Sequence, residues 1–349
     1  MLTEKQIREI REHLEKAQNP LFFFDNDNDG LISFLLLRRF IDRGRGVAIK
    51  SFPELNVSYY RKVSELKPDY VFILDKPVVS ADFLEKLKQD NIPVVWIDHH
   101  QVEEPVYGGV NYYNPFLNDK SNEPVSFLCY KITGRKEDIW LAVIGCVSDS
   151  YIPDFYDEFL KKYPELGKKN PKSAFDILYK TEIGRIARVL DFSLKDTTTN
   201  VVNMMKFMMK SNSPMDILQE DIKTKQILKR YNEINSKYQA LVEKAREGAW
   251  KKVVYFQYGG TLSLSANLAN LLSYEFPDKV IVVVFINGDI ANISLRGGKD
   301  TRELTLKAIE GIEGATGGGH KFATGAKMSV SYLPKFKEKI EELINKEDD

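Results

Sequence analysis

Aspartate and histidine residues gather in this sequence at points where short apolar runs end. Three aspartates alternate in the string DNDNDG after LFFF, one follows VFIL, and one stands with two histidines after VVWI. These residues are Asp25, Asp27, Asp29, Asp75, Asp98, His99 and His100. Alternate residues of an extended segment point to one side, so DNDNDG directs several carboxylates at a shared point. Because carboxylate and imidazole together suit Zn, Mn or Fe, the pattern indicates a metal site.

Each segment also has a plainer interpretation. The DNDNDG string could be a solvated turn or a helix cap, with Gly30 allowing a tight turn, and Asp75 taken alone is typical of a strand-end cap. His99 and His100 could be polar loop residues beside an aspartate. The string also has the spacing of an EF-hand loop, but the twelfth position, which that loop fills with glutamate, is Leu36. Calcium binding of that kind is therefore disfavoured.

Three further features lie later in the chain. Asp149 ends the apolar segment LAVIGCVSD, where a carboxylate is equally typical of a cap and of a ligand. The run Gly317–Gly319 can expose backbone N–H groups and adopt positive φ, which suits an anion nest around a phosphate, although glycine runs are also common in flexible turns. His320 adjoins this run and Arg296 lies upstream in ISLRGG, and both residues favour phosphate binding.

The elements expected around these residues alternate between strands and helices. Thr3 and Gln6 form a capping box that predicts a helix from about residue 4 to about residue 17. Apolar runs at 21–24, 47–52, 70–75 and 94–100 predict strands, with charged helical segments between them. Such alternation predicts a parallel sheet covered on both faces, an α/β fold that binds ligands beyond the carboxyl ends of its strands. Carboxylates from several strand ends would crowd there, which is costly unless a cation neutralises them.

The rest of the chain divides into a helical region and a second α/β region. Residues 151–250 lack strand patterns, and the segments at 173–192 and 216–250 predict helices, the second long and highly charged. This charged helix could be a connecting arm or an oligomerisation helix. From KKVVYFQY (251–258) onward, strand and helix patterns alternate again and end in an amphipathic helix.

Size and charge set the broad class of protein. The 349 residues, 43% apolar and 29% charged, predict two packed domains of unequal size. Fifty basic and fifty acidic residues cancel, so no net field draws the protein towards DNA or an anionic membrane, and any nucleic-acid site must be a local patch. Because the first 17 residues lack an apolar signal core and no run is long enough to span a membrane, a cytoplasmic protein without membrane contact is expected. Cys129 and Cys146 lie in apolar runs and are expected to be buried free thiols.

Taken in order, these motifs resemble those of a known superfamily. DNDNDG, ILD, IDHH and VIGCVSD are similar to the four motifs of the DHH phosphoesterases, and SLR with GGGH is similar to the DHH-associated C-terminal domain. The resemblance covers residues 21–326, and the triple-aspartate first motif is most similar to RecJ-like single-strand exonucleases and their archaeal relatives. It implies a parallel-sheet DHH domain at 1–195, a helical linker at 196–250 and a smaller α/β substrate-binding domain at 251–345.

The resemblance also implies a centre with two Mn²⁺ ions, for which Mg²⁺ is the alternative ion. The metal ligands that it implies are Asp27, Asp29, Asp75, His99 and Asp149. Asp98 matches a supporting carboxylate, and His100 matches a group that contacts the scissile phosphate. The substrate-holding positions of the C-terminal domain are matched by Arg296, Gly317, Gly318, Gly319 and His320. One departure is Phe23, where many members have a histidine ligand, so that either Asp25 supplies the missing ligand or one ion is held more loosely.

The expected reaction is two-metal hydrolysis of a phosphodiester bond, in which water made nucleophilic by the cations attacks phosphorus in line. The first candidate is an exonuclease for single-stranded DNA or RNA, with NYYNPF (111–116) suited either to base stacking or to a structural role. The second candidate is a hydrolase of short oligonucleotides, nanoRNA or cyclic dinucleotides. The third is a non-catalytic protein of a replication or repair assembly, against which the retained ligand residues argue. Other copies of the chain and replication or repair proteins are the candidate partners.

Overall fold

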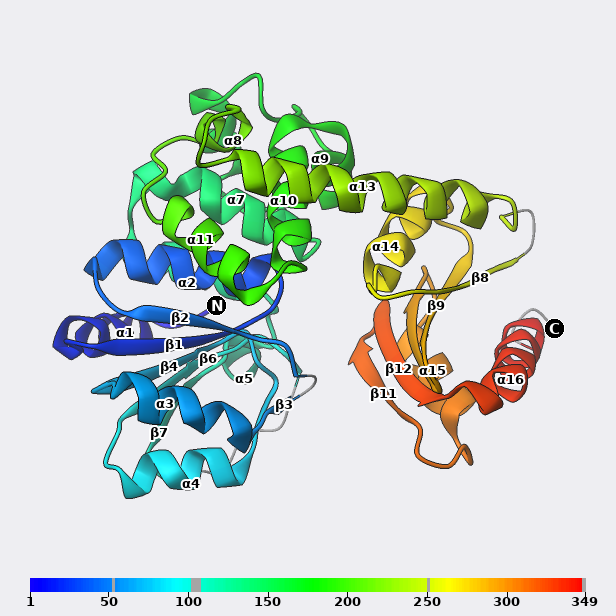
Figure 1. Cartoon of the computed structure of the whole chain (residues 1–349), viewed down its shortest axis with the longest axis horizontal. Helices are drawn as coiled ribbons and strands as arrows, with labels where there is room; N and C mark the ends of the chain where they lie inside the picture. Colours follow the sequence, from blue (N-terminus) through cyan, green and yellow to red (C-terminus); the bar gives the residue numbers. More distant parts are fainter. Residues whose placement is uncertain (52–53, 102–107, 250–251, 347–349) are drawn as a thin grey trace. The chain divides into compact units, whose positions relative to one another are not determined.

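The computed structural model describes residues 1–51, 54–101, 108–249 and 252–346. The chain forms two compact units, Met1–Tyr231 and Asn232–Asp349, and the boundary falls inside helix α13 (Lys225–Arg246). Each unit combines a five-stranded sheet with helices, which confirms the predicted α/β fold with a parallel-sheet N-terminal part (Figure 1). Across the described ranges, no helix has both the length and the apolar character that crossing a membrane requires.

The sheet of the first unit is parallel throughout. Its strands lie in the order β2 (Arg45–Ile49), β1 (Pro20–Asp25), β4 (Tyr70–Leu74), β6 (Val94–Ile97) and β7 (Val110–Tyr113). The four predicted strands are confirmed, although β2 ends at Ile49 and β6 at Ile97, and Phe52 of the predicted second strand lies outside the described residues. Residues 110–113 add a fifth strand that the sequence patterns do not predict.

Aromatic side chains of β1 pack against the helices on both faces of this sheet. Phe22 and Phe24 lie against Phe34 of α2 (Asn28–Ile41), with ring centroids 5.6 and 5.1 Å apart. Phe23 lies on the other face, 5.5 Å from Phe83 of α4 (Ala81–Gln89). A strand that is covered on both faces buries every side chain, which explains the uninterrupted apolar run in its sequence.

The remaining elements of the first unit surround this sheet. Helix α1 (Glu4–Lys16) begins at the predicted capping box, in which Thr3 and Gln6 each accept a backbone N–H of the other. The others before residue 150 are β3 (Glu54–Leu55), η1 (Val57–Tyr59), α3 (Tyr60–Leu66), β5 (Val78–Val79), α5 (Pro115–Asp119), α6 (Val125–Thr133), η2 (Lys136–Asp138) and α7 (Ile139–Ser148). Cys129 and Cys146, on α6 and α7, are buried free thiols as predicted.

The helical region is more broken than its sequence predicts. It contains α8 (Tyr156–Lys162), α9 (Ala174–Lys180), α10 (Glu182–Leu194), α11 (Thr198–Met208) and α12 (Met215–Leu218), followed by α13. The segment 173–192 is divided at Thr181, which is extended and caps α10 through the N–H of Gly184. The long helix predicted from residue 216 begins only at Lys225, because Asp221 and Thr224 form a hydrogen-bonded turn before it.

Antiparallel pairing dominates the second unit. Its strands lie in the order β11 (Thr316–His320), β12 (Ala323–Ser329), β10 (Ile290–Arg296), β9 (Val280–Asn287) and β8 (Val253–Gly259), and β8 is parallel to β9. The helical elements of this unit after α13 are α14 (Ser265–Glu275), α15 (Thr301–Ile309), η3 (Val330–Tyr332) and α16 (Leu333–Lys346). Its core joins Val282, Ile293 and Leu295 of the sheet to Leu304 of α15 and Phe336 of α16.

Candidate functional site

The first aspartates lie where β1 passes into α2. Asp27 caps α2, since its Oδ1 accepts the N–H of Gly30 at 3.0 Å. A Cβ at Gly30 would lie 2.4 Å from the carbonyl oxygen of Asp25, so the close approach of helix and strand requires glycine. The predicted tight turn is therefore not the reason for glycine here, because Gly30 already lies inside α2.

Asp29 is fixed by a second helix. Its Oδ2 accepts the N–H of Val125 and its Oδ1 the N–H of Ser126, each at 2.8 Å, in the first turn of α6. The Asp29 side chain is buried, and Pro124, at the N-cap of α6, provides no side-chain cap. Asp29 therefore satisfies backbone donors that the start of α6 would otherwise leave unpaired. This role is additional to the metal ligation that the resemblance implies.

Neighbouring strands and one helix provide the remaining groups. Asp75 follows β4, and Asp98, His99 and His100 follow β6, the strand next to β4. Asp149 is the C-cap residue of α7. His99 Nε2 lies 3.4 Å from Asp75 Oδ1 and 3.8 Å from Asp149 Oδ2. The structure thus brings together all the aspartates and histidines that the sequence predicts for this unit's site.

Overlapping sets of these side chains could hold divalent cations. Within each set, one ligand atom per residue lies within 4.8 Å of the others. The sets are Asp29, His99 and Asp149; Asp75, Asp98 and His100; and Asp25, Asp27 and Asp75. Carboxylates combined with imidazoles form a donor set that suits Mn²⁺, Fe²⁺ or Zn²⁺. The residues therefore fit the divalent ions that the resemblance implies.

Crowding raises the pKa values of several of these groups. Burial, followed by the charges of Asp29 and Asp27, raises the pKa of Asp75 well above its ordinary value. Desolvation by the surrounding protein, with the charges of Asp25 and Asp29, raises the pKa of Asp27 to about 7, although part of this side chain reaches solvent. Burial raises the pKa of Asp149 to about 6 against the opposing effect of His99. Burial would lower the pKa of His99, but the charges of Asp149 and Asp29 outweigh it and raise that pKa.

These shifts predict that the metal-free protein loses stability as the pH rises. A carboxyl group whose pKa is higher in the folded than in the unfolded protein favours folding while it is protonated. The contribution of Asp149 is therefore complete below about pH 4 and is lost as the pH rises through about 6. In EDTA, we expect Asp149→Asn to melt at a higher temperature than the wild type at about pH 8 and to approach it near pH 4.

Differential scanning calorimetry at both pH values measures this difference. Asp154→Asn is the matched control, because Asp154 is an exposed aspartate of the same unit that pairs with Lys131 at 2.9 Å. The control should melt like the wild type at both pH values. If the melting temperatures of Asp149→Asn and the wild type change equally with pH, the folded protein does not raise the pKa of Asp149 and the prediction is wrong.

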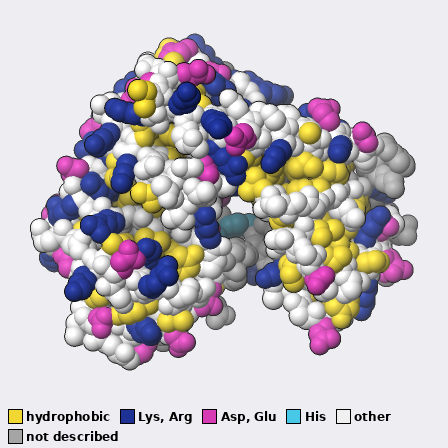
Figure 2. All heavy atoms as spheres, in the orientation of Figure 1, with side chains coloured by type: hydrophobic (Ala, Val, Ile, Leu, Met, Phe, Trp, Pro, Cys, Tyr) yellow, Lys and Arg dark blue, Asp and Glu magenta, His cyan; other side chains and the backbone are white. Residues whose placement is uncertain are grey.

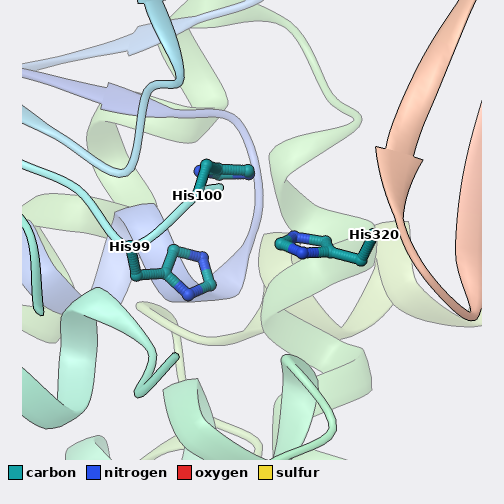
Figure 3. A group of neighbouring side chains, drawn as sticks. All are labelled: His99, His100 and His320. Carbon is teal, nitrogen blue, oxygen red and sulfur yellow. The ribbon is translucent and has the colours of Figure 1, made fainter. Parts of the chain in front are cut away.

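His100 is oriented by a chain of polar contacts. Its Nδ1 lies 2.8 Å from Asp98 Oδ1, and the hydroxyl of Tyr112 donates to Asp98 Oδ2 at 3.2 Å. Asn114 donates to the backbone oxygen of His100 and to the Tyr112 hydroxyl, each at 2.9 Å. Figure 3 shows the rings of His99 and His100 on the segment that follows β6. Tyr112 and Asn114 are thus positioning residues, so the structural interpretation of NYYNPF holds for these two side chains.

Lys76 is a residue of this site that the sequence patterns do not reveal. Its side chain is fully buried, and Nζ donates to Asp25 Oδ1 at 2.7 Å and to the Ser51 carbonyl oxygen at 2.9 Å. Its own carbonyl oxygen accepts the indole N–H of Trp96 at 2.8 Å. In the sequence, its position directly after Asp75 is the feature that could have identified it as a residue of the site. Asp25 therefore already has a cationic partner within the protein.

The predicted substrate-holding residues of the second unit lie on the two strands that flank β12. Arg296 on β10 and His320 on β11 both stand opposite Ala323 of β12. Arg296 Nε donates to Asn270 Oδ1 at 2.5 Å, and its Nη1 donates to the Leu295 carbonyl oxygen at 2.7 Å. Asn270 lies on α14 and is not among the residues that the sequence singles out.

The glycine run is a strand and not a loop. Gly317–Gly319 belong to β11 and pair with β12, and within the run only Gly319 has a positive φ, of 134°. The predicted anion nest is therefore wrong in form, because an extended backbone does not turn successive N–H groups toward one point. β11 lies at the edge of its sheet, and an edge strand presents N–H groups on its outer side.

Among known protein families, one family model matches the C-terminal part of the chain. Residues 251–346 match the family model described as the DHHA1 domain. A 100-residue stretch is 31% identical to an uncharacterized protein of Methanocaldococcus jannaschii, over 27% of this chain and 22% of that protein. The chain therefore spans less than a quarter of the length of this relative.

Solved structures match the chain along nearly its whole length. RecJ of Thermus thermophilus in complex with Mn²⁺ matches 99% of this chain, and 56% of its own length, with a TM-score of 0.69 and 15% identity. A second exonuclease RecJ bound to manganese matches 98% of this chain and 94% of its own, with a TM-score of 0.65 and 16% identity. The DHH domain of a protein assigned to a family of ribosomal proteins matches 97% of this chain and 89% of its own, with a TM-score of 0.69 and 16% identity. At these identities the matches establish a common fold.

Proposed function

We propose that this chain, which contains a DHHA1 domain and shares its fold with RecJ, is a RecJ-like DHH phosphoesterase that hydrolyses phosphodiester bonds of single-stranded DNA or RNA from an end. The observation that carries this proposal is the meeting of Asp27, Asp75, His99 and Asp149 from three strand ends and one helix end. Carboxylates crowded with raised pKa values are typical of sites that are built to receive cations.

We assign the parts of the reaction to the domains that the sequence predicts. Residues 1–195 hold the metal centre, 196–250 form the linker, and 251–345 hold the substrate. Mn²⁺ is the proposed ion, since manganese is present in the RecJ structures that share this fold. When bound, divalent ions activate water and stabilise negative charge on phosphoryl oxygens. The proposed ligands are Asp27, Asp29, Asp75, His99 and Asp149.

The other side chains of the site act on the substrate or on the ligands. Asp98 holds His100 through Nδ1, so Nε2 is the ring nitrogen that can meet a phosphoryl oxygen of the substrate. Tyr112 and Asn114 fix that pair in place. Arg296 and His320 of the second unit are proposed to hold a neighbouring phosphate, with β11 offering backbone N–H groups. We propose that the cell uses this activity in the cytoplasm, in DNA or RNA turnover or repair.

The charge distribution supports a single-stranded substrate over a long duplex. Lys and Arg side chains are interspersed with Asp and Glu on the face shown in Figure 2, in line with the equal numbers of basic and acidic residues. Binding to a long duplex depends on many phosphate contacts from basic residues. A single strand, which also offers its bases for stacking, needs fewer such contacts.

Digestion of end-labelled strands tests the proposed function. The purified full-length chain is incubated with Mn²⁺ and with single-stranded DNA or RNA of about 30 nucleotides labelled at either end, beside a duplex of the same sequence. A ladder from one end of the single strand, with the duplex spared, is the expected result. Cleavage confined to di- to tetranucleotides would instead identify the short-oligonucleotide hydrolase. No cleavage and no Mn²⁺ binding would identify a non-catalytic protein.

Titration with Mn²⁺ separates the roles of Asp25 and Asp27. Because Asp25 already accepts the Lys76 ammonium at 2.7 Å, we expect it to support the centre without replacing the ligand that is missing at Phe23. Phe23 itself is buried in the core. Asp25→Asn should weaken Mn²⁺ binding by about 10-fold, the lower end of the effect of a supporting group. Asp27→Asn should remove one equivalent of bound ion.

Isothermal titration calorimetry and Mn²⁺ electron paramagnetic resonance measure affinity and stoichiometry without reference to activity. Asp42→Asn serves as the control, because this exposed aspartate also follows an element of the first unit and pairs with Arg38 on the surface. Loss of a full equivalent in Asp25→Asn would show that Asp25 takes the place of the histidine.

A further inference from the structure

An exposed aromatic ring stands on the hairpin that follows the glycine strand. Phe322 lies in the connection between β11 and β12, two residues after His320, and is 53% exposed. Every other Phe, Tyr or Trp in the described ranges is less open to solvent. A single exposed apolar side chain is common on protein surfaces, so what makes Phe322 informative is its position two residues from a proposed phosphate-binding residue.

The backbone around Phe322 is held firmly. His320 and Ala323 pair across the hairpin, and the carbonyl oxygen of Lys321 accepts the N–H of Thr301 at 2.8 Å and its hydroxyl at 3.2 Å. Thr301 is fully buried at the start of α15, and its own carbonyl oxygen accepts the hydroxyl of Thr305 at 2.7 Å. A ring presented on a fixed backbone loses little conformational entropy when a ligand covers it.

The surroundings of Phe322 suit nucleic acid better than an apolar protein surface. The ammonium of Lys321 lies 5.5 Å from the centre of the ring. Arg296 and His320 stand opposite Ala323, the residue that follows Phe322. A side chain at Gly318 would meet nothing within 4 Å, so the backbone of β11 is open at this position. Cationic groups and an aromatic face beside accessible backbone are the features with which proteins bind single strands.

We propose that Phe322 stacks on a base of the single-stranded substrate while Arg296 and His320 hold an adjoining phosphate. This inference rests on the proposed function and names one of the residues that select its substrate. Stacking accepts any base, because every base has a π-face, so Phe322 favours single strands without favouring a sequence. A duplex, whose bases already stack on one another, offers the ring no such face.

Binding of a fluorescent strand tests this proposal. The full-length protein with Mn²⁺ is titrated into a phosphorothioate single strand that resists cleavage and carries 2-aminopurine, whose fluorescence falls on stacking. Phe322→Ala and Phe322→Leu should each raise the Kd by about 5- to 150-fold, the range that corresponds to one stacked base. Phe322→Trp should bind at least as tightly as the wild type and quench the 2-aminopurine. A strand with abasic positions should bind the wild type and Phe322→Ala alike.

Ile290→Ala is the matched control. Ile290 is an exposed apolar residue, 37% accessible, at the opposite end of β10 from Arg296, and its loss should leave the Kd unchanged. If Phe322→Ala and the wild type bind equally while His320→Ala weakens binding, the stacking role is overturned and the proposed function stands. If the wild type neither binds nor cleaves any strand, both the stacking role and the proposed function fail.

Discussion

Asp75→Asn should abolish cleavage and, in the absence of metal, raise the melting temperature. Asp75 is buried among Asp25, Asp27, Asp29 and Asp149, and its pKa is raised well above the ordinary value by burial and by their charges. In the metal-free protein, a carboxyl group at this position must either stay protonated above its ordinary pKa or ionise beside the other carboxylates. Asparagine removes this cost but also removes a proposed ligand of the ions. Because bound metals supply several kcal/mol to such reactions, we expect kcat to fall by about 10³-fold or more.

Asparagine is the informative replacement at this position. Asp75 has a φ of 57°, in the left-handed region, where asparagine and aspartate are tolerated better than other side chains. The melting temperature in EDTA should rise by about 2–4 °C for each kcal/mol of repulsion that is relieved. Addition of Mn²⁺ should stabilise the wild type more than the variant, because a bound ion stabilises only the state that holds it.

Asp42→Asn controls for both effects. Asp42 is also an aspartate in the left-handed region, with a φ of 50°, but its side chain is 97% exposed. This variant should keep the wild-type kcat and melting temperature. A metal-free Asp75→Asn protein that melts below the wild type would show that the carboxylates are not in conflict, and the electrostatic argument for the metal centre would fail with it.

Asp29→Ala should have the opposite effect on stability. Its two carboxylate oxygens accept the N–H groups of Val125 and Ser126, each at 2.8 Å, in the first turn of the buried helix α6. Loss of these acceptors leaves buried donors unpaired, which costs about 1–3 kcal/mol for each group. Relief of repulsion offsets part of this cost, and we expect a net loss of about 2–4 kcal/mol in the free energy of unfolding.

Urea unfolding in EDTA measures this loss without any contribution from metal. Ser80→Ala is the comparison, because Ser80 caps α4 by accepting one N–H, that of Phe83 at 3.3 Å, and its loss should cost about 1 kcal/mol. An Asp29→Ala protein as stable as the wild type would contradict the capping role. If Asp29→Ala is destabilised as predicted, a loss of activity in this variant does not by itself show that a metal ligand has been lost.

Asp29 and Asp75 illustrate why the members of one motif set need separate tests. In the sequence both are aspartates of a metal motif, and both are buried in the folded chain. One is held by two helical N–H groups, whereas the other lies 3.4 Å from the imidazole of His99 among like charges. The first is expected to stabilise the fold, and the second is expected to destabilise it until a cation arrives.

The sequence by itself determined the alternation of strands and helices and the position of aspartates and histidines after β1, β4 and β6. These features are local, because an apolar run of strand length and a polar residue at its end are visible in a few consecutive residues. The general rule that ligands bind at the carboxyl ends of parallel strands then predicted that Asp27, Asp75 and His99 would meet. The neighbouring positions of β1, β4 and β6 bring these residues to one edge of the sheet.

Tertiary structure alone decided which partner each of these groups has. Asp25 faces Lys76, Asp29 holds the start of α6, and Asp149 arrives on a helix from a region without strands. The glycine run became an edge strand because β12 was available to pair with it, and Phe322 was left exposed at the turn between them. Local periodicity specifies an element, whereas the partner of a buried charge depends on which distant segments pack beside it.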